Sequence, residues 1–176
     1  IIQKAGDIIP DVVGVIKNLR DGSQKKFHFP KKCPIRQNEV IKRAAEVAYY
    51  CQNKKCYGQN LEGLIHFVSK KGFNIEGLGD KIVAQLIDNG LISNPADIFG
   101  LKVGDLEPLE GFASKKAEKL IEAIYRSREI DLSNFIYALG IRHIGEETAI
   151  LLANSFASLK EISKARAEKL TAITDI

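Results

Sequence analysis

Apolar residues recur at helical spacing in the chain after residue 60, which predicts a series of amphipathic helices. Each run presents one apolar face, made in turn by Leu61, Leu64, Ile65 and Val68; by Ile82, Val83, Leu86 and Ile87; by Ala117, Leu120, Ile121 and Ile124; and by Ala149, Leu152, Ala153 and Phe156. The polar residues around these runs fit helix ends. Asp80 is expected to cap the second helix, Asn89-Gly90 to close it, and Ser114 to start the third.

The first 60 residues follow other patterns. Val and Ile are frequent from Ile8 to Lys17, Asp21-Gly22 supplies a turn, and residues 25–30 alternate between polar and apolar, which predicts two or three β-strands. A piece this short cannot close a β-barrel, so we expect residues 1–30 to end a larger β-domain; a free-standing ribbon is the alternative. Residues 31–60 are loop-rich and need a metal or a neighbour to hold them.

A short motif precedes three of the predicted helices. It is an apolar residue between two small or turn-tolerant ones: Gly77-Leu78-Gly79, Gly111-Phe112-Ala113 and His143-Ile144-Gly145. The first members lie 34 and 32 residues apart, and another 32 residues lead to Asp175-Ile176, so we expect a tandem repeat with its fourth copy truncated. A tetratricopeptide solenoid has a similar period, but its fixed positions lie on the facing surfaces of paired helices rather than in a turn.

A tight turn before a helix N-terminus is suited to anion binding, because unpaired backbone N–H groups and the positive end of the helix dipole converge there. Glycine at Gly77, Gly79, Gly111 and Gly145 is expected to allow positive φ and close approach of a phosphate. These turns predict helix-hairpin-helix motifs that contact a nucleic-acid backbone without reading its sequence. Cations lie within a few residues of them: Lys81, Lys115, Lys116 and Arg142, for which solvated helix-face charges are the alternative.

Composition narrows the class of protein. The 176 residues are 45% hydrophobic and 27% charged, which suits a globular chain. No apolar run approaches the roughly 20 residues of a membrane span, and no signal peptide is recognisable, so we expect a cytoplasmic protein without membrane contact. The chain contains no Met, even at residue 1, which suggests an internal piece of a longer protein.

Charge is divided unevenly along the chain. Residues 1–72 carry 14 Lys and Arg against 6 Asp and Glu, whereas residues 73–176 carry 12 against 16. The net charge of +4 therefore combines a basic first part with an acidic second part. The cations of the second part support nucleic-acid binding only because they lie beside the turns. The odd count of three cysteines suggests a metal site or spare thiols in a reducing compartment.

Several separate sequence segments resemble the C-terminal half of bacterial NAD-dependent DNA ligases. They are Lys4-Ala5-Gly6-Asp7-Ile8-Ile9-Pro10, Phe29-Pro30-Lys31-Lys32-Cys33-Pro34, His66-Phe67-Val68-Ser69-Lys70, Ile75-Glu76-Gly77-Leu78-Gly79-Asp80-Lys81 and Ala138-Leu139-Gly140-Ile141-Arg142-His143-Ile144-Gly145-Glu146. They occur in the family's order and span essentially the whole chain. The resemblance implies a mainly α-helical fold: C-terminal OB-fold strands over 1–30, a small zinc-finger-like segment over 31–60, and a helix-hairpin-helix domain over 61–176.

The resemblance also implies a function. Such ligases seal nicks in double-stranded DNA during replication and repair, using NAD and magnesium bound in other parts of the enzyme. This portion would grip the DNA backbone through Gly77, Gly79, Lys81, Gly111, Lys115, Lys116, Arg142 and Gly145. The adenylation domain with its KxDG motif is absent, so we expect no catalytic residue and no ligation without the missing N-terminal part. We also expect these residues to lack the family's BRCT domain.

The expected zinc ligands depart from the family's pattern. The resemblance implies four cysteines, the first two as Cys-Pro-x-Cys, but Arg36 stands where the second is expected. Cys33, Cys51 and Cys56 remain, and arginine cannot replace a thiolate ligand. His28 is the nearest substitute, although an ordinary strand histidine is the simpler interpretation. Zinc binding is therefore open at this stage.

Two alternative functions remain open. A stand-alone helix-hairpin-helix repair enzyme such as a base-excision glycosylase would need a pocket carboxylate or lysine and a flipped base. A junction-binding or protein-interaction module would have no catalytic group. Neither His66, which is expected to border the core, nor His143, whose position in a hairpin suits a residue tolerant of left-handed conformations, is predicted to be catalytic.

Overall fold

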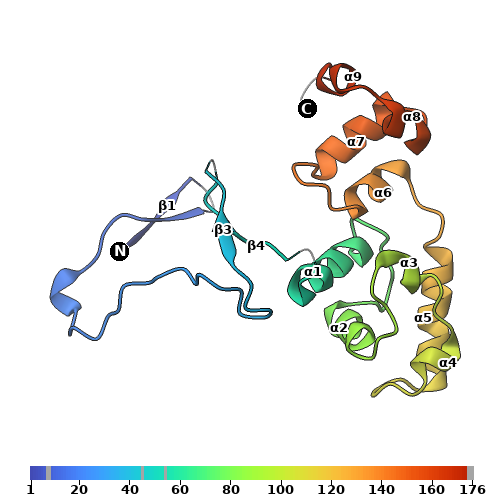
Figure 1. Cartoon of the computed structure of the whole chain (residues 1–176), viewed down its shortest axis with the longest axis horizontal. Coiled ribbons are helices and arrows are strands. Elements are labelled where there is room, and N and C mark those ends of the chain that lie inside the picture. The colour runs from blue at the N-terminus through green and yellow to red at the C-terminus, as the bar shows by residue number, and fades with distance from the viewer. Residues whose placement is uncertain (7–8, 45, 54, 174–176) are drawn as a thin grey trace.

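A computed structural model describes residues 1–6, 9–44, 46–53 and 55–173 of the chain (Figure 1). Two small antiparallel ribbons come first. β1 (Ile2–Ala5) pairs with β2 (Ile9–Val12), and β3 (Val40–Lys42) pairs with β4 (Tyr49–Cys51). A short 3-10 helix, η1 (Lys17–Leu19), lies between the ribbons in the sequence.

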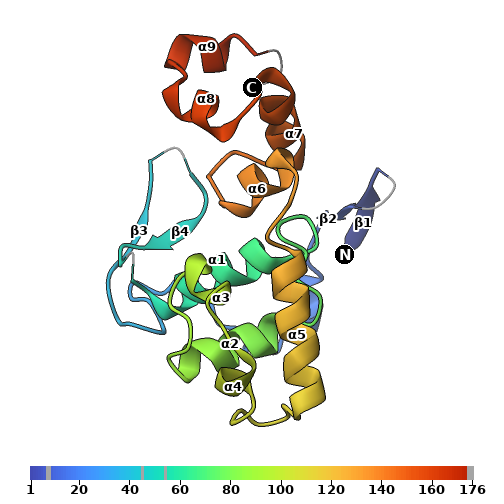
Figure 2. The ribbon, with the colours of Figure 1, turned by 90° about the vertical axis from the view of Figure 1, so that its right-hand side faces the viewer.

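Between Tyr57 and Thr171 the regular elements are all helices, so the predicted mainly α-helical class is confirmed. The helices are α1 (Tyr57–Val68), α2 (Asp80–Asp88), α3 (Pro95–Ile98), α4 (Val103–Leu106), α5 (Ser114–Arg126), α6 (Leu132–Ala138), α7 (Glu146–Ser155), α8 (Leu159–Lys164) and α9 (Ala167–Thr171). Both ribbon views place α1 to α5 at one end of the helical part and α7 to α9 at the other, with α6 between (Figures 1 and 2).

The helices bury the apolar faces that their periodicity predicts. A larger core is built on Leu64, Val83 and Leu86, which are almost fully buried, and it extends to the apolar face of α5. A smaller core joins α6 and α7 through Ile136 and Leu152. Helices this short are marginal in isolation, so their packing is what stabilises them.

The strand predictions are partly wrong. Residues 25–30 form no strand in the structure, and Phe27 is 73% exposed, because no neighbouring strand pairs with this segment among the described residues. The strand expected from Ile8 to Lys17 is limited to β2. Conversely, β3 and β4 form within the segment predicted to be loop-rich, where they bring Val40 opposite Cys51.

The start of α2 also differs from expectation. Gly79 occupies the cap position without a side-chain cap, and Asp80 is the first helical residue. The Asp80 carboxylate still lies in the first turn, where it interacts favourably with the helix dipole. At the other end the prediction is confirmed: Asn89 ends the helix, and Gly90 follows with φ of 69°.

The β1–β2 ribbon leaves its apolar side chains in solvent. Ile2, Ile9 and Val12 are each about 70% exposed, and Figure 1 shows the ribbon well apart from the helices. A two-stranded ribbon exposed on both faces is not stable by itself in water. For this physical reason we retain, as a proposal, the prediction that residues 1–30 complete a larger β-domain.

Candidate nucleic-acid interface and thiol cluster

The three predicted bends share one backbone geometry. The central apolar N–H donates to the carbonyl three residues earlier, in the pairs Leu78 to Ile75 (3.1 Å), Phe112 to Leu109 (3.1 Å) and Ile144 to Ile141 (3.0 Å). The preceding residue has positive φ, at Gly77 (83°), Gly111 (76°) and His143 (67°). A β-turn with a left-handed third residue has this hydrogen bond and this sign of φ. The internal repeat is therefore a structural repeat, and His143 takes the left-handed conformation anticipated for it.

The central residues anchor the bends. Leu78 and Phe112 are buried in the larger core, with 2% and 7% of their surfaces exposed, and Ile144 packs half-buried against the smaller core. Each bend is thereby fixed to the helices that it joins. The fourth bend expected at Asp175-Ile176 lies outside the described residues.

Backbone amides after each bend have no hydrogen-bond acceptor in the described part of the chain. They belong to the last residue of the motif and the next two: Gly79, Asp80 and Lys81; Ala113, Ser114 and Lys115; Gly145, Glu146 and Glu147. These groups lie in the first turns of α2, α5 and α7, where the helix dipole is positive. Each bend therefore offers an anion a set of oriented N–H donors.

The four glycines have two different roles. The prediction of positive φ is correct for two of them and wrong for the other two. Gly77 and Gly111 have the predicted positive φ. Gly79 and Gly145 occupy cap positions with φ of −86° and −85°, which any residue adopts. A Cβ added at Gly79 or Gly145 would meet no protein atom within 4 Å, so the two glycines leave open space in front of the amides.

The first two bends lie close together. Both contribute to one cleft of about 400 Å³, which is lined by Gly77 of the first bend, Phe112 of the second, and Lys116 and Leu120 of α5. From α2, the Gln85 side chain donates to the Glu110 carbonyl at 3.0 Å, just before the second bend. The two bends are thus neighbours in space as well as repeats in sequence.

The third bend is connected to α1 and to the segment that precedes the first bend. Lys71, in the segment between α1 and the first bend, forms an ion pair with Glu146, the first residue of α7. The hydrogen bond to this carboxylate raises the pKa of Lys71. In α6, which leads to the third bend, the Tyr137 carbonyl accepts a hydrogen bond from His66 Nε2 of α1 at 2.8 Å. His66 therefore has a structural role beside the core, as expected.

The predicted DNA-contacting cations differ in their surroundings. Lys81 and Lys115 are exposed and form no ion pair or side-chain hydrogen bond within the described residues. Lys116 instead donates to the Gly111 carbonyl at 2.9 Å, and its Nζ lies 4.3 Å from the centre of the Phe112 ring. Lys116 thus braces the second bend, whereas Lys81 and Lys115 belong to the first turns of α2 and α5 and have exposed side chains.

Arg142 is held by the loop between β3 and β4. Its guanidinium donates to Glu46 Oε1 at 2.6 Å and lies 5.4 Å from the centre of the Tyr50 ring. This hydrogen bond, together with one from Tyr50, lowers the pKa of Glu46, and the same bond to Glu46 raises the pKa of Arg142. The guanidinium of Arg43 also lies over the Tyr50 ring, 5.2 Å from its centre. These groups connect the loop-rich segment to the third bend.

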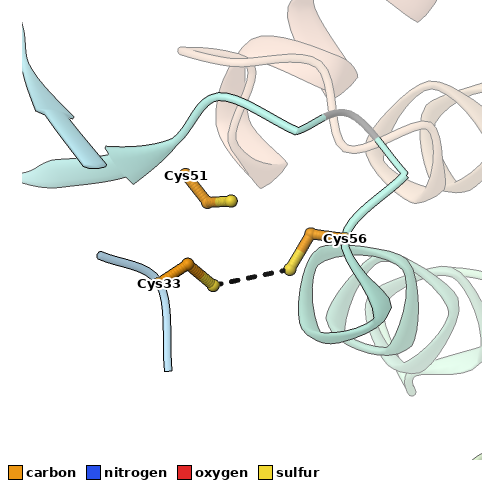
Figure 3. A group of neighbouring side chains, drawn as sticks. All are labelled: Cys33, Cys51 and Cys56. Carbon is orange, nitrogen blue, oxygen red and sulfur yellow. Dashed lines mark hydrogen bonds between the residues drawn. The ribbon is translucent and has the colours of Figure 1, made fainter. Parts of the chain in front are cut away.

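The three cysteines gather in one cluster at the start of the helical part (Figure 3). Their sulfur atoms all lie within 4.8 Å of one another, and the Sγ atoms of Cys33 and Cys56 are 3.8 Å apart. Cys33 and Cys56 are buried, whereas Cys51 is half-buried. All three are free thiols, so no disulfide holds the cluster together.

The turn after Cys33 directs backbone donors toward its sulfur. Hydrogen bonds from the N–H groups of Arg36 and Ile35 lower the pKa of the Cys33 thiol. At Cys51, the Asn53 N–H acts in the same direction, but burial and the neighbouring Cys33 outweigh it and raise the pKa. A metal ion would favour the thiolate form of all three cysteines.

No helix in the described ranges is long and apolar enough to cross a membrane.

The fold and the repeated bends define a tandem helix-hairpin-helix protein. The sequence matches a family described as "SAM-like Helix-hairpin-helix tandem" over residues 73–125, and one described as "Helix-hairpin-helix motif" over residues 134–176. The first match covers the first two bends, and the second covers the third.

The chain is also similar over its full length to bacterial DNA ligases. It is 44% identical to the DNA ligases of Halothermothrix orenii and Pelotomaculum thermopropionicum and 42% identical to that of Bacillus mycoides, with all of this chain aligned in each case. It spans about a quarter of each relative's length, 26% in all three. The resemblance to the C-terminal half of a bacterial DNA ligase is thereby confirmed.

Reasoning from the sequence missed the contacts that connect the segments. Glu46, Tyr50 and Lys71 were not candidate residues, because no local pattern links them to Arg142 or Glu146, which lie far away in the sequence. The clustering of the cysteines, in contrast, could be anticipated from their number and spacing.

Proposed function

We propose that this chain is the DNA-gripping part of an NAD-dependent DNA ligase that seals nicks in duplex DNA in the bacterial cytoplasm. The observation that carries the proposal is the repeated set of unpaired amides at the starts of α2, α5 and α7, each after the same turn. Amides read phosphate oxygens and not bases, so the grip is independent of sequence, as an enzyme that acts at any nick requires.

The residues at the bends have different roles in the proposed DNA contact. The phosphate contacts are assigned to the amides at Gly79, Gly145 and the residues that follow each, with Lys81 and Lys115 supplying long-range attraction. Gly77 and Gly111 set the turns, and Lys116 holds the second. Arg142 is assigned a phosphate contact that requires exchange of its partner Glu46.

Catalysis belongs to the remainder of the ligase in this proposal. The adenylation domain, which takes NAD, and the magnesium site lie outside this chain, and the N-terminal part of the same enzyme is the proposed partner. The similarity of the whole chain to about a quarter of each DNA ligase favours this function over a stand-alone repair or junction-binding module.

The thiol cluster is the proposed site of a structural zinc ion. For a Zn–S distance of about 2.3 Å, two ligands of a tetrahedral site are about 3.8 Å apart. Cys33 and Cys56 already have this separation, and Cys51 lies close enough to join them. Zinc bound by the three thiolates would link the β3–β4 segment to the start of α1, which carries Cys56 at its cap.

The test is a binding titration of the 176-residue chain on intact and nicked duplexes of two unrelated sequences, at several salt concentrations. We expect the two sequences to bind equally, nicked DNA to bind more tightly, and affinity to fall as salt rises. Lys115→Gln should reduce the slope of log affinity against log salt by about 0.9, and Lys160→Gln on α8 serves as the matched control.

A supporting measurement adds the missing part of the enzyme. Mixed with the N-terminal portion of a relative, the chain should restore sealing of a nicked duplex, whereas neither part should seal alone. Tight binding to one sequence only, or a salt slope unchanged by Lys115→Gln, would count against phosphate contacts at the bends.

A further inference from the structure

The thiol cluster provides three of the four ligands that zinc takes in a closed site. A structural zinc ion is tetrahedral and almost always has four protein ligands. The chain has three cysteines in total, and all three are already in the cluster. No histidine or carboxylate of the described residues joins the three sulfurs at ligand distance.

The described residues around the cluster do not supply a fourth ligand for the remaining coordination position, which we call the fourth corner of the tetrahedron. Arg36 stands where the resemblance implies a cysteine, and a guanidinium has no lone pair to donate to a metal. His28 lies in an exposed irregular segment, His66 is bonded to the Tyr137 carbonyl, and His143 belongs to the third bend. Solvent can reach the cluster on the side of Cys51, which is half-buried while the other two thiols are buried.

We propose that Cys33, Cys51 and Cys56 form a three-thiolate zinc site whose fourth corner takes an exchangeable ligand from solution. Water occupies the corner at rest, and a small thiolate replaces it when one is present. The inference rests on the proposed zinc ion and adds an open coordination position to it. Zinc sites with three protein ligands keep such a position accessible, whereas sites with four do not.

Cobalt substitution tests the open corner directly. The reduced 176-residue chain is loaded with Co²⁺, and its visible spectrum is recorded while a monothiol such as 2-mercaptoethanol is added. We expect a tetrahedral thiolate spectrum whose bands shift as the monothiol binds. X-ray absorption of the zinc-loaded chain, without added thiol, should show three sulfur ligands and one oxygen.

Two variants of the same residue provide the matched comparison. Arg36→Cys supplies a fourth thiol, so its cobalt spectrum should no longer respond to monothiol, and a chelator should remove its zinc more slowly than from the parent chain. Arg36→Ala removes the charge without adding a ligand and should respond as the parent chain does.

The outcomes distinguish failure of the proposed metal ion from failure of the proposed open coordination position. If the reduced chain retains neither cobalt nor zinc, the proposed metal itself is wrong and the thiols are ordinary core cysteines. If metal is retained but the spectrum ignores monothiol, or four protein ligands are found, the site is closed and the open corner is wrong. The DNA titrations report on the bends separately from either result.

Discussion

At the scale of single residues, the two glycines of the first bend contribute through different properties. Gly77 supplies a backbone conformation, with φ of 83°, that side chains with a Cβ adopt at a cost. Gly79 has an ordinary φ and supplies empty space before the unpaired amides. One position therefore serves the protein's own stability, and the other serves the approach of a ligand.

Alanine substitutions can distinguish these properties. Gly77→Ala should lower the free energy of unfolding by about 1–2 kcal/mol, because it forces a Cβ into the left-handed region. Gly79→Ala should change it by less than about 1 kcal/mol. Its Cβ nevertheless stands where the phosphate is proposed to lie, so DNA affinity should fall. Urea denaturation and DNA titration of both variants provide the measurements.

The Gly79→Ala variant is the decisive one, since its fold is expected to persist. Gly104→Ala is a suitable control, because Gly104 lies in α4, outside the three bends, and a Cβ there also meets no protein atom within 4 Å. Unaltered DNA affinity in Gly79→Ala would mean that no phosphate approaches this amide.

Prediction of single residues from the sequence succeeded where few residue types can adopt the required backbone conformation. A turn between helices that needs positive φ favours glycine or a tolerant residue, so Gly77, Gly111 and His143 could be identified. It failed at Gly79 and Gly145, because glycine is also chosen for the space it leaves. The sequence does not distinguish the two reasons.

At the scale of the structural element, the bends repeat in backbone geometry but differ in electrostatics. The first turn of α7 begins with Glu146 and Glu147, whereas α5 begins with Ser114, Lys115 and Lys116. Carboxylates stabilise a helix N-terminus through its dipole, but they also repel a phosphate that approaches the same amides. Lys71 offsets part of this charge at the third bend through its ion pair with Glu146.

Lys115 and Lys116 are adjacent in α5, and their contacts predict separate effects. Lys116→Met keeps the aliphatic chain but removes the ammonium group that bonds the Gly111 carbonyl and lies over the Phe112 ring. We expect it to lower the free energy of unfolding by roughly 0.5–1 kcal/mol. Lys115→Met should leave stability within about 0.5 kcal/mol, because this exposed side chain forms no ion pair or hydrogen bond within the described residues.

Thermal denaturation of the two variants, followed by circular dichroism, measures this difference. The DNA titration gives the complementary result: Lys115→Met should lower the salt slope as strongly as Lys115→Gln does. Equal stability of the two methionine variants would show that the contact between Lys116 and the bend contributes nothing in solution.

Prediction of elements succeeded for the helices and was poor for the strands. A helix satisfies its backbone hydrogen bonds within itself, so local periodicity was enough to predict α2, α5 and α7. A strand needs a partner, and residues 25–30 have the alternation but no neighbour to pair with among the described residues. β3 and β4 are three residues each, too short for a pattern to emerge.

At the scale of the whole molecule, the basic N-terminal part and the acidic helical part meet at the Arg142 cluster. Glu46 comes from the loop between β3 and β4, and Arg142 comes from the third bend. Arg142 was a candidate residue, but its pairing with Glu46 could not be derived from the sequence, because it depends on how separate segments pack. The cluster is one of the contacts between the loop-rich segment and the helices.

The pKa of Glu46 predicts how this contact responds to pH. The hydrogen bond from Arg142 holds the pKa of Glu46 below its ordinary value near 4.3. A lowered pKa means that the contact contributes fully above the unfolded-state pKa and is lost as pH falls through the lower, folded-state value. The β3–β4 loop should therefore detach from the third bend in acid, while at neutral pH it stays docked.

NMR spectra of the Tyr50 ring and the Arg142 guanidinium, followed from neutral to acidic pH, measure this detachment. Glu46→Gln should give at neutral pH the spectrum that the parent chain reaches only in acid. It should also strengthen DNA binding, because Arg142 no longer has to leave a carboxylate for a phosphate. Glu62→Gln on α1 removes the same charge without touching the cluster and should change neither property. If Glu46→Gln leaves the Arg142 signal unchanged, or weakens binding to DNA, then Glu46 does not compete with DNA for this arginine.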